Sequence, residues 1–374
     1  MNIIFIIFVF VFYSGICVYT GFRFLGFIKF FLPVLNSIIF WILFMLLCYS
    51  LIISGFTKSV FLLRRAGIYW MGIILYLLIL FILSDIFRLG LFFFGKKIRN
   101  FSFFSTAISF VVCICFLIYG IIHAKSLSSV HYRVTIPGQG GELRVALISD
   151  LHIGRTIGGK WVSKIVDHIN SADIDMVLIP GDVFDGSIDM VRDLQDVLNQ
   201  LKRIQAPLGV YACPGNHDTD RTFKGGTERI AESLKSAGVI FMQDDVYAIR
   251  DNLYIIGRKD ARPIGMESNR KSASELCAGL DGTIVMLDHQ PVDFLREEDA
   301  GISLVLSGHT HAGQIFPANL ITRVIYKKAG AVHYGYWKGK NMQAIVTSGA
   351  GFWGPPMRIA SNNEVAFIDI VFDQ

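Results

Sequence analysis

Acidic side chains are almost missing from the first third of the sequence. Residues 1–125 contain ten Lys and Arg residues but a single acidic residue, Asp85. The rest of the chain holds 25 basic and 29 acidic residues, so the formal net charge of +5 comes wholly from the N-terminal third. A nucleic-acid-binding domain needs its basic residues on the folded domain. We therefore expect no nucleic-acid partner, because this distribution is typical of basic residues that flank membrane segments.

Cysteine is also scarce, and its spacing is uninformative. Four of the six cysteines lie within apolar runs: Cys17, Cys48, Cys113 and Cys115. No spacing is typical of a disulfide framework or of a thiolate metal site. The chain shows no internal repeat and no low-complexity linker. A metal site in this protein would therefore have to use other donors.

The N-terminal third contains four long apolar runs. They occupy residues 2–22, 30–56, 67–84 and 101–122. Each reaches the length needed to cross a bilayer as a helix, which takes ~20 residues. The sequence predicts an all-α, four-helix transmembrane region over residues 1–125 and a separate catalytic domain over residues 126–374.

Four spans would place both ends of this region on one side of the cell membrane. Six basic residues fall on the loops of one side and four on the other. The positive-inside rule then favours, by a small margin, an extracytoplasmic C-terminal domain. Asp85 and Arg88 follow the third run, and we interpret them as a helix end at the interface rather than an intramembrane polar site.

From residue 130 onward, short apolar runs alternate with amphipathic segments. Strands are predicted at Tyr132–Ile136, Leu143–Ser149, Asp175–Ile179, Leu208–Cys213, Val239–Met242, Leu253–Ile256, Thr283–Leu287, Ile302–Leu306, Gln343–Thr347 and Glu364–Val371. Helices are predicted at Lys160–Ile169, Met190–Ile204, Glu228–Ala237 and Ser272–Leu280. This alternation predicts an α/β domain with a layered sheet core.

Five of the predicted strands run into residues that commonly bind metals. These residues are Asp150 and His152; Asp182 and Asp185; Asn216, His217 and Asp218; Asp288 and His289; and His309 and His311. Ligands of α/β sheets gather outside the carboxyl ends of the strands, so we expect these side chains to share one crevice. In extended chain, residues i and i+2 project to the same side, so Asp150 with His152, and His309 with His311, can each present two ligands.

The donors in this set are oxygen and imidazole, without thiolate. Such donors suit two divalent ions of the Mn, Fe, Zn or Mg type and do not select among them. A bridging carboxylate could hold two ions about 3.5–4 Å apart, where they polarise a phosphoryl oxygen and ionise water near neutral pH. Gly181, Gly215 and Gly308 precede the ligands and allow sharp turns with a close approach of the backbone.

In this order, the motifs resemble the series found in calcineurin-like metallophosphoesterases. The matching stretches are Asp150-Leu-His152, Gly181-Asp182-Val-Phe-Asp185, Gly215-Asn216-His217-Asp218, His289 and Gly308-His309-Thr-His311. The resemblance implies a four-layer αββα sandwich and hydrolysis of phosphomonoesters or phosphodiesters by metal-activated hydroxide. Residues 308–314 and 353–358 (WGPPMR) are similar to the membrane-associated bacterial branch, which includes lipid A pathway hydrolases of UDP-diacylglucosamine. The four apolar spans favour a membrane-proximal substrate, such as a lipid phosphate or a lipid-linked nucleotide.

The resemblance also implies a role for each site residue. One ion would be held by Asp150, His152, Asp182 and His311, and the other by Asp182, Asn216, His289 and His309, with Asp182 bridging. His217 would contact the phosphate and protonate the leaving oxygen. Asp185 would orient His217. Asp218 is left without a definite role, and His289 is the least specific ligand, because a lone histidine before Gln-Pro is a weak motif.

Several features of the sequence are open to more than one interpretation. Residues 320–342 carry five basic residues among four aromatic ones, as in a solvated loop or hairpin, or in a substrate-binding or membrane-facing flap. Arg155 and Arg358 are weak candidates for a phosphate contact. The alternative to an enzyme is a membrane sensor or scaffold whose phosphoesterase domain binds metal without turnover. A transport protein is less favoured, because the spans contain few polar residues that could line a pathway.

Overall fold

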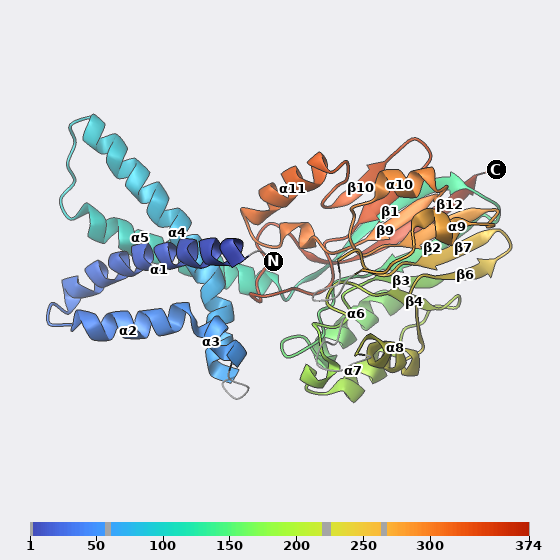
Figure 1. Cartoon of the computed structure of the whole chain (residues 1–374), viewed down its shortest axis with the longest axis horizontal. Helices are drawn as coiled ribbons and strands as arrows, with labels where there is room; N and C mark the ends of the chain where they lie inside the picture. Colours follow the sequence, from blue (N-terminus) through green and yellow to red (C-terminus); the bar gives the residue numbers. More distant parts are fainter. Residues whose placement is uncertain (1–2, 57–60, 219–225, 263–267, 374) are drawn as a thin grey trace. The chain divides into compact units, whose positions relative to one another are not determined.

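The chain divides into two compact units. The computed structural model describes residues 3–56, 61–218, 226–262 and 268–373. The first unit comprises Met1–Ile121 with Gly354–Pro356, and the second comprises Ile122–Trp353 with Met357–Gln374. Each unit has apolar cores of its own. The strands of the described residues all belong to the second unit (Figure 1).

Helices make up the first unit. They are α1 (Ile3–Phe31), α2 (Ser37–Cys48), α3 (Ser50–Phe56), α4 (Phe61–Phe93) and α5 (Phe101–His123). Three of them, α1, α4 and α5, contain stretches long and apolar enough to cross a membrane, whereas α2 is shorter. The predicted run 30–56 is thus divided into two helices. Asn36 caps the start of α2 by accepting from the backbone N–H of Ile38 at 2.8 Å, and Tyr49 leaves helical geometry with φ −96° and ψ 5°.

Asp85 lies inside α4. The expectation that a helix ends there is wrong, because α4 continues to Phe93. The Asp85 carboxylate accepts a hydrogen bond from the Tyr19 hydroxyl at 2.5 Å and lies 3.4 Å from the Arg23 guanidinium. An acidic group in an apolar helix needs such partners, and here α1 supplies both.

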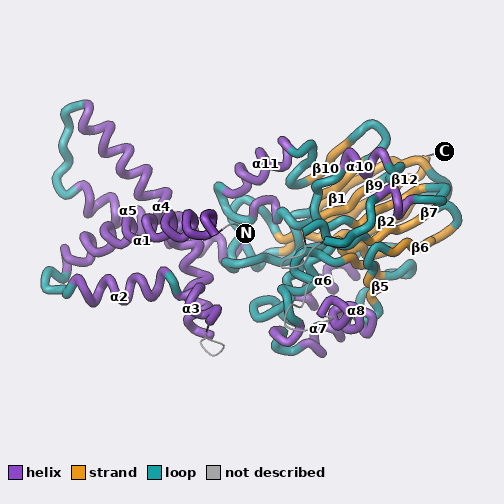
Figure 2. Tube along the Cα trace, in the orientation of Figure 1, coloured by secondary structure: helices purple, strands orange, loops and turns teal. Residues whose placement is uncertain are grey.

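Two six-stranded sheets form the centre of the second unit (Figure 2). The first sheet has the order β1-β12-β2-β3-β4-β5, and the second has the order β10-β11-β9-β8-β7-β6. The strands of the first sheet are β1 (Leu127–Pro137), β12 (Asn363–Asp373), β2 (Glu142–Leu147), β3 (Met176–Pro180), β4 (Val210–Cys213) and β5 (Val239–Phe241). Those of the second are β10 (Gly335–Lys338), β11 (Gln343–Val346), β9 (Leu304–Ser307), β8 (Thr283–Leu287), β7 (Leu253–Gly257) and β6 (Asp245–Arg250).

The central strands of each sheet are buried on both faces, which gives four layers. Leu178 of β3 packs between the sheets, whereas its neighbour Val177 packs in the core with α6 (Gly159–Asn170), α7 (Leu194–Leu201) and α8 (Gly226–Ser236). In β8, Val285 joins the core between the sheets, and Ile284 faces α9 (Ala273–Cys277) and α10 (Phe294–Asp299). Successive residues of a strand face opposite sides, so each sheet needs a covering layer on both sides. The αββα sandwich implied by the motifs is confirmed.

All ten predicted strands and all four predicted helices are present in this unit. The edge strands β6 and β10 were not predicted, nor were α10 and α11 (Ala318–Lys328). Strands β2, β3 and β4 run parallel, as do β7, β8 and β9. Within each sheet, the loops after these strands therefore emerge at one edge, and the predicted ligands lie on those loops.

Candidate metal centre

Seven side chains that were predicted as ligands meet at the strand ends. They come from the loops after β2 (Asp150 and His152), β3 (Asp182), β4 (Asn216), β8 (His289) and β9 (His309 and His311). They form two groups that share Asp182. The geometry of each group follows from its interatomic distances.

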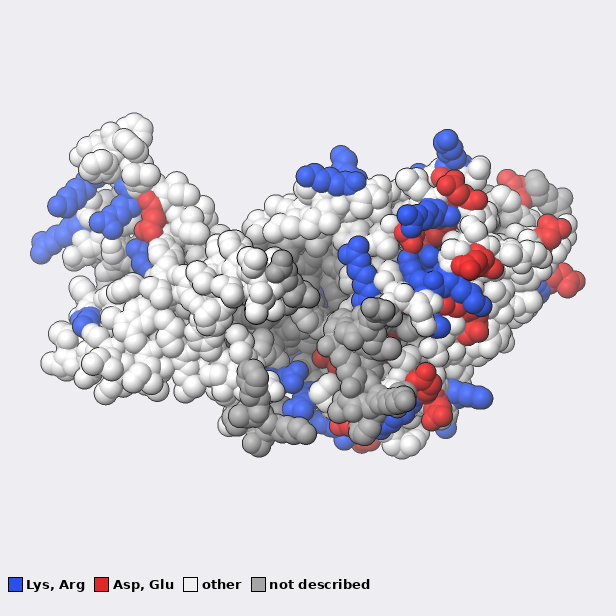
Figure 3. Space-filling model, viewed as in Figure 1, with Lys and Arg blue, Asp and Glu red and all other residues white. Residues whose placement is uncertain are grey.

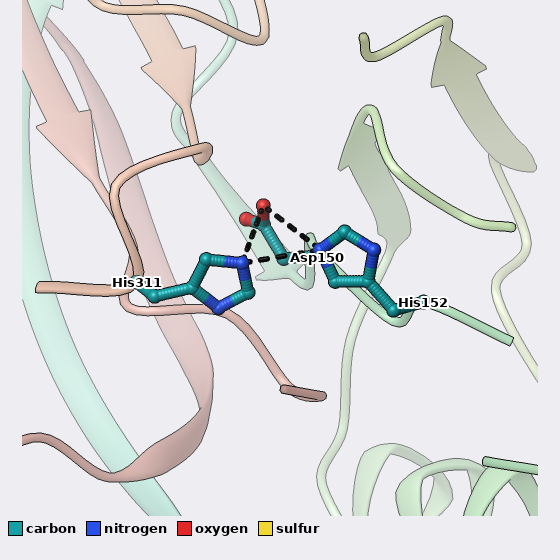
Figure 4. A group of neighbouring side chains, drawn as sticks. All are labelled: Asp150, His152 and His311. Atoms are coloured by element: carbon teal, nitrogen blue, oxygen red, sulfur yellow. Dashed lines mark hydrogen bonds and ion pairs between the residues drawn. The ribbon is translucent and has the colours of Figure 1, made fainter. Parts of the chain in front are cut away.

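The first group contains Asp150, His152 and His311, whose side chains point toward one another (Figure 4). The two Nε2 atoms of His152 and His311 are 3.1 Å apart. The Asp150 Oδ1 atom lies 3.5 Å from His311 Nε2 and 4.0 Å from His152 Nε2. All three residues are buried. Their nitrogen and oxygen atoms thus surround one small locus.

The second group is built around Asn216. Its Oδ1 atom lies 2.8 Å from His309 Nδ1 and 3.0 Å from His289 Nε2. The Asp182 Oδ2 atom is 3.2 Å from His289 Nε2 and 3.7 Å from His152 Nε2, so this carboxylate lies between the two groups. His289 Nδ1 faces the Pro180 carbonyl oxygen at 2.9 Å, which can only accept. Burial would lower the pKa of His289, but the charge of Asp182 and the hydrogen bond to it outweigh burial and raise the pKa. When the ring is neutral, Nδ1 carries the proton and the lone pair of Nε2 is directed into the group.

These atoms fit divalent cations. The facing atoms are carboxylate and amide oxygens and imidazole nitrogens, all of which offer lone pairs to a metal. Burial lowers the pKa of His152 to about 4 and that of His309 to about 3, so both rings are neutral at pH 7. Burial raises the pKa of Asp150 to about 6. Neutral imidazoles and ionised carboxylates are the forms that bind metal.

The loops that carry the ligands have an uncommon backbone conformation. Positive φ angles, between 45° and 70°, occur at Asp150, His152, Asp182, His309 and His311. The prediction that Asp150–His152 and His309–His311 are extended pairs is therefore wrong in its geometry. Both pairs lie in left-handed backbone conformations instead. Asp150 and His152 face the same group, whereas His309 and His311 face different groups. Non-glycine residues keep such angles only where the surroundings hold them, and here the Asp150 carboxylate accepts from the His309 backbone N–H at 3.0 Å.

Three glycines allow these loops to approach one another closely. A Cβ atom on Gly181, whose φ is 81°, would lie 2.6 Å from His289 Nδ1. A Cβ atom on Gly308 would lie 2.3 Å from the Asp150 carboxylate. Side chains at these positions would displace the ligands. A Cβ atom on Gly215 would likewise lie 2.2 Å from Asp182 Oδ1, so the expected close approach is confirmed at all three positions.

His217 and Asp185 lie beside the first group. His217 Nδ1 is 3.2 Å from Asp185 Oδ1, and the His217 ring centroid is 4.9 Å from that of His152. Burial alone would lower the pKa of His217, but the hydrogen bond to Asp185 and the charges of Asp182 and Asp185 outweigh it, so the pKa is raised. His217 is therefore disposed to carry a proton near neutral pH. The ring centroid of Trp353, which the sequence did not identify as a site residue, lies 5.6 Å from that of His217.

Asp218 links two loops of the site, a structural role that the sequence did not reveal. Its buried carboxylate accepts from the backbone N–H groups of Val183 at 3.2 Å, Phe184 at 2.9 Å and Gly215 at 2.9 Å. It therefore joins the loop that carries Asp182 to the loop that carries Asn216. Burial and the nearby Asp182 charge raise the pKa of Asp218 to about 7. The only signal in the sequence was an acidic residue directly after His217.

Two further candidates play supporting parts. Asp288 ends a strand but turns to Arg258 at 3.1 Å and Arg270 at 2.8 Å, so it is not in either ligand group. Arg358 is fully buried, and its Nη2 atom donates to the Ser348 carbonyl at 2.7 Å. The suggestion that Arg358 contacts a substrate phosphate is wrong, because the residue is fully buried and its guanidinium donates hydrogen bonds to backbone carbonyl groups.

The guanidinium of Arg358 also lies directly behind one ligand. Its Nη2 atom is 3.3 Å from Nδ1 of His311, and it donates to the Gly351 carbonyl at 2.5 Å. A buried cation fixed by backbone carbonyls restricts the orientation of the neighbouring ring. Arg358 therefore helps to set the position of His311.

Comparisons with known proteins agree with this geometry. The family model of the calcineurin-like phosphoesterases matches residues 143–313. The chain is 31% identical over 237 residues to an uncharacterized metallophosphoesterase of Helicobacter pylori (strain ATCC 700392 / 26695), covering 62% of this chain and 60% of that protein. It is 29% identical over 290 residues to a Danio rerio protein described as a transmembrane protein with metallophosphoesterase domain, covering 73% of this chain and 64% of that protein.

The similarity to solved structures is more distant. A 5'-nucleotidase precursor from Thermus thermophilus has 16% sequence identity and a TM-score of 0.36, covering 62% of this chain and 54% of that one. The chain spans less than two thirds of the length of the curated relatives named above. The matched segment, residues 143–313, contains all seven predicted ligands. Over this domain, the chain is similar to the calcineurin-like phosphoesterases.

Proposed function

We propose that the protein is a membrane-anchored, metal-dependent phosphoesterase that hydrolyses phosphomonoesters or phosphodiesters. The observation that carries this proposal is the convergence of seven oxygen and nitrogen ligands into two groups that share the Asp182 carboxylate. Burying this many oxygen and nitrogen lone pairs costs free energy of folding unless cations bind to them. Two bound ions would remove that cost.

In the proposal, each group holds one divalent ion. Asp150, His152 and His311 would hold the first, Asn216, His289 and His309 would hold the second, and Asp182 would contribute to both. Such ions, when bound, polarise the phosphoryl group and lower the pKa of water in the site. The donor set is compatible with Mn, Fe, Zn or Mg. The protein contributes the positions of these ligands.

His217 is the proposed general acid. Asp185 accepts the Nδ1 proton, and this contact fixes the tautomer and orientation of the ring. The raised pKa keeps a proton on His217 at the pH where the carboxylates are ionised. That proton can pass to the leaving oxygen as the ester bond breaks. The ring of Trp353 lies against that of His217 on this side of the site.

The apolar helices motivate the second half of the proposal. Three helices of the first unit are long and apolar enough to cross a membrane. A relative from Danio rerio carries the description of a transmembrane protein. A multi-pass anchor would hold the catalytic domain close to a bilayer, where a lipid-linked phosphoester is within reach. Such proximity favours a lipid-linked phosphoester or a nucleotide-lipid as the class of substrate.

Turnover by the purified full chain in detergent tests the enzymatic proposal. The protein is loaded with Mn²⁺ and assayed on p-nitrophenyl phosphate and its bis ester, with Fe²⁺, Zn²⁺ and Mg²⁺ compared in turn. We expect Asp182→Asn to lower activity by about 10–100-fold or more, since a shared ligand is lost. Asp173→Asn is the matched control, because the side chain of Asp173 is 97% exposed.

The outcome separates the two functional hypotheses. Equal activity of Asp182→Asn and the wild type would refute the mechanism. A protein that binds two ions but turns over no phosphoester in a broad panel, lipid esters included, would instead support a metal-binding sensor or scaffold.

A further inference from the structure

Helix α11 has its apolar side turned away from the domain. Leu320, Ile321, Val324 and Ile325 are between 50% and 58% exposed. They lie within about 140° of one another around the helix axis, at the 3.6-residue period. The opposite side, with Thr322 and Tyr326, is partly buried against the sandwich. A helix of a soluble domain normally buries its apolar stripe, so this exposed stripe indicates a further partner.

The charges of α11 restrict what that partner is. Arg323, Lys327 and Lys328 are exposed, and the helix contains no acidic residue. Figure 3 shows basic side chains over one end of α11, with the remainder of the helix white. A partner that covers this helix must therefore accept apolar side chains and must be anionic beside them.

A second copy of the chain fits these charges poorly. In a two-fold contact the same patch meets itself, so the basic residues of two helices would be brought together. An anionic lipid surface supplies both missing properties, because acyl chains accept the aliphatic residues and headgroups attract Lys and Arg. The chain itself carries three helices apolar enough to cross a membrane. A bilayer is thus the surface that its own anchor would keep nearby.

We propose that α11 is an interfacial helix that lies on a bilayer containing anionic lipids. Leu320, Ile321, Val324 and Ile325 enter the boundary between headgroups and acyl chains, and the three basic residues contact the headgroups. Phe316, which precedes the helix and is 45% exposed, extends the apolar surface. The proposal does not depend on catalytic turnover.

The position of α11 links this surface to the metal centre. The helix follows the short turn η2 (His311–Gly313), which contains a candidate ligand. Gln314, between the two, accepts from the Trp353 backbone N–H at 3.0 Å and donates to the Trp353 carbonyl at 2.8 Å. Trp353 in turn contacts the ring of His217. A membrane bound by α11 therefore lies at the rim of the candidate site.

Photocrosslinking in the full-length protein tests the proposal. The chain is reconstituted into nanodiscs of phosphatidylcholine, with or without phosphatidylglycerol, and p-benzoylphenylalanine is placed at Ile325. The matched control carries the same group at Leu295, an aliphatic residue of α10 that is 62% exposed. We expect lipid adducts, measured by mass spectrometry, to be several-fold more abundant at Ile325 than at Leu295, and to increase with phosphatidylglycerol.

A variant without the basic residues of α11 distinguishes specific binding of this helix to anionic lipid from simple closeness of the helix to the bilayer. Replacement of Arg323, Lys327 and Lys328 by Gln should remove the increase with phosphatidylglycerol and leave the circular dichroism spectrum unchanged. Equal lipid adducts at Ile325 and Leu295 would overturn the proposal. Adducts at Ile325 that join two protein chains instead of protein and lipid would also overturn it, and would identify α11 as a self-association surface.

Discussion

Substitution of Asp218 by Asn gives a quantitative test of how the site is held together. The Asp218 carboxylate accepts three backbone N–H groups, with Val183 and Gly215 on Oδ2 and Phe184 on Oδ1. An Asn side chain keeps one acceptor oxygen. In its better orientation, that oxygen replaces Oδ2 and retains two bonds, while the amide NH₂ faces the N–H of Phe184. One buried donor is then left unsatisfied, which costs about 1–3 kcal/mol.

The lost hydrogen bond is one of those that join the loop carrying Asp182 to the loop carrying Asn216. Removing a group that orients metal ligands typically weakens metal affinity by about 10–100-fold. Titration calorimetry of Mn²⁺ into chelator-treated Asp218→Asn, with the full chain in detergent, should therefore show a decrease in that range. Asp218 is not itself in either ligand group, so the number of ions bound at saturation should not change.

The control substitution is at the start of β3, the strand that leads into the loop carrying Asp182. Asp175 precedes β3 and accepts a single backbone N–H, that of Arg144, at 2.7 Å. Asp175→Asn should leave Mn²⁺ affinity unchanged. Affinity that is equally unaffected in Asp218→Asn would refute the reasoning, because the clamp between the two ligand loops would then be dispensable.

Four further outcomes follow from the geometry and the charges. His217→Gln should lower kcat by about 10²–10⁴-fold while the bound metal, measured by elemental analysis, stays at the wild-type level. Asp185→Asn should lower the pKa of His217, since the Asp185 hydrogen bond raises it, and should move the alkaline limb of the pH–rate profile to lower pH. Chelation should abolish activity and Mn²⁺ should restore it. Mn²⁺ affinity should fall below about pH 6, where the raised pKa of Asp150 lets a proton compete for that ligand.

The fold could be predicted from the sequence where burial left a strong pattern. Strands with both faces buried, such as β3 and β8, are continuous apolar runs and were recognised. The edge strand β6 is largely exposed along its length and carries no such pattern. Helix α11 has the helical period, but no residue of it is fully buried, so its segment was expected to be a loop, a hairpin or a flap.

The candidate site was predictable as a set of residues but not as a geometry. The candidate residues could be recognised because they follow strands whose ends must meet, and the resemblance to the phosphoesterase motifs selected the seven ligands among them. The positive φ angles at Asp150 and His309 could not, because they depend on contacts between loops far apart in the sequence. The same holds for Arg358, whose partners are backbone carbonyls that no sequence pattern identifies.

Anomalous diffraction from crystals of the Mn²⁺-loaded protein tests the central claim most directly. The account predicts two manganese peaks about 3.5–4 Å apart. One should contact Asp150, His152 and His311, and the other should contact Asn216, His289 and His309, with Asp182 between them. A single peak, or a second peak away from Asp182, would contradict the proposal of a dinuclear centre.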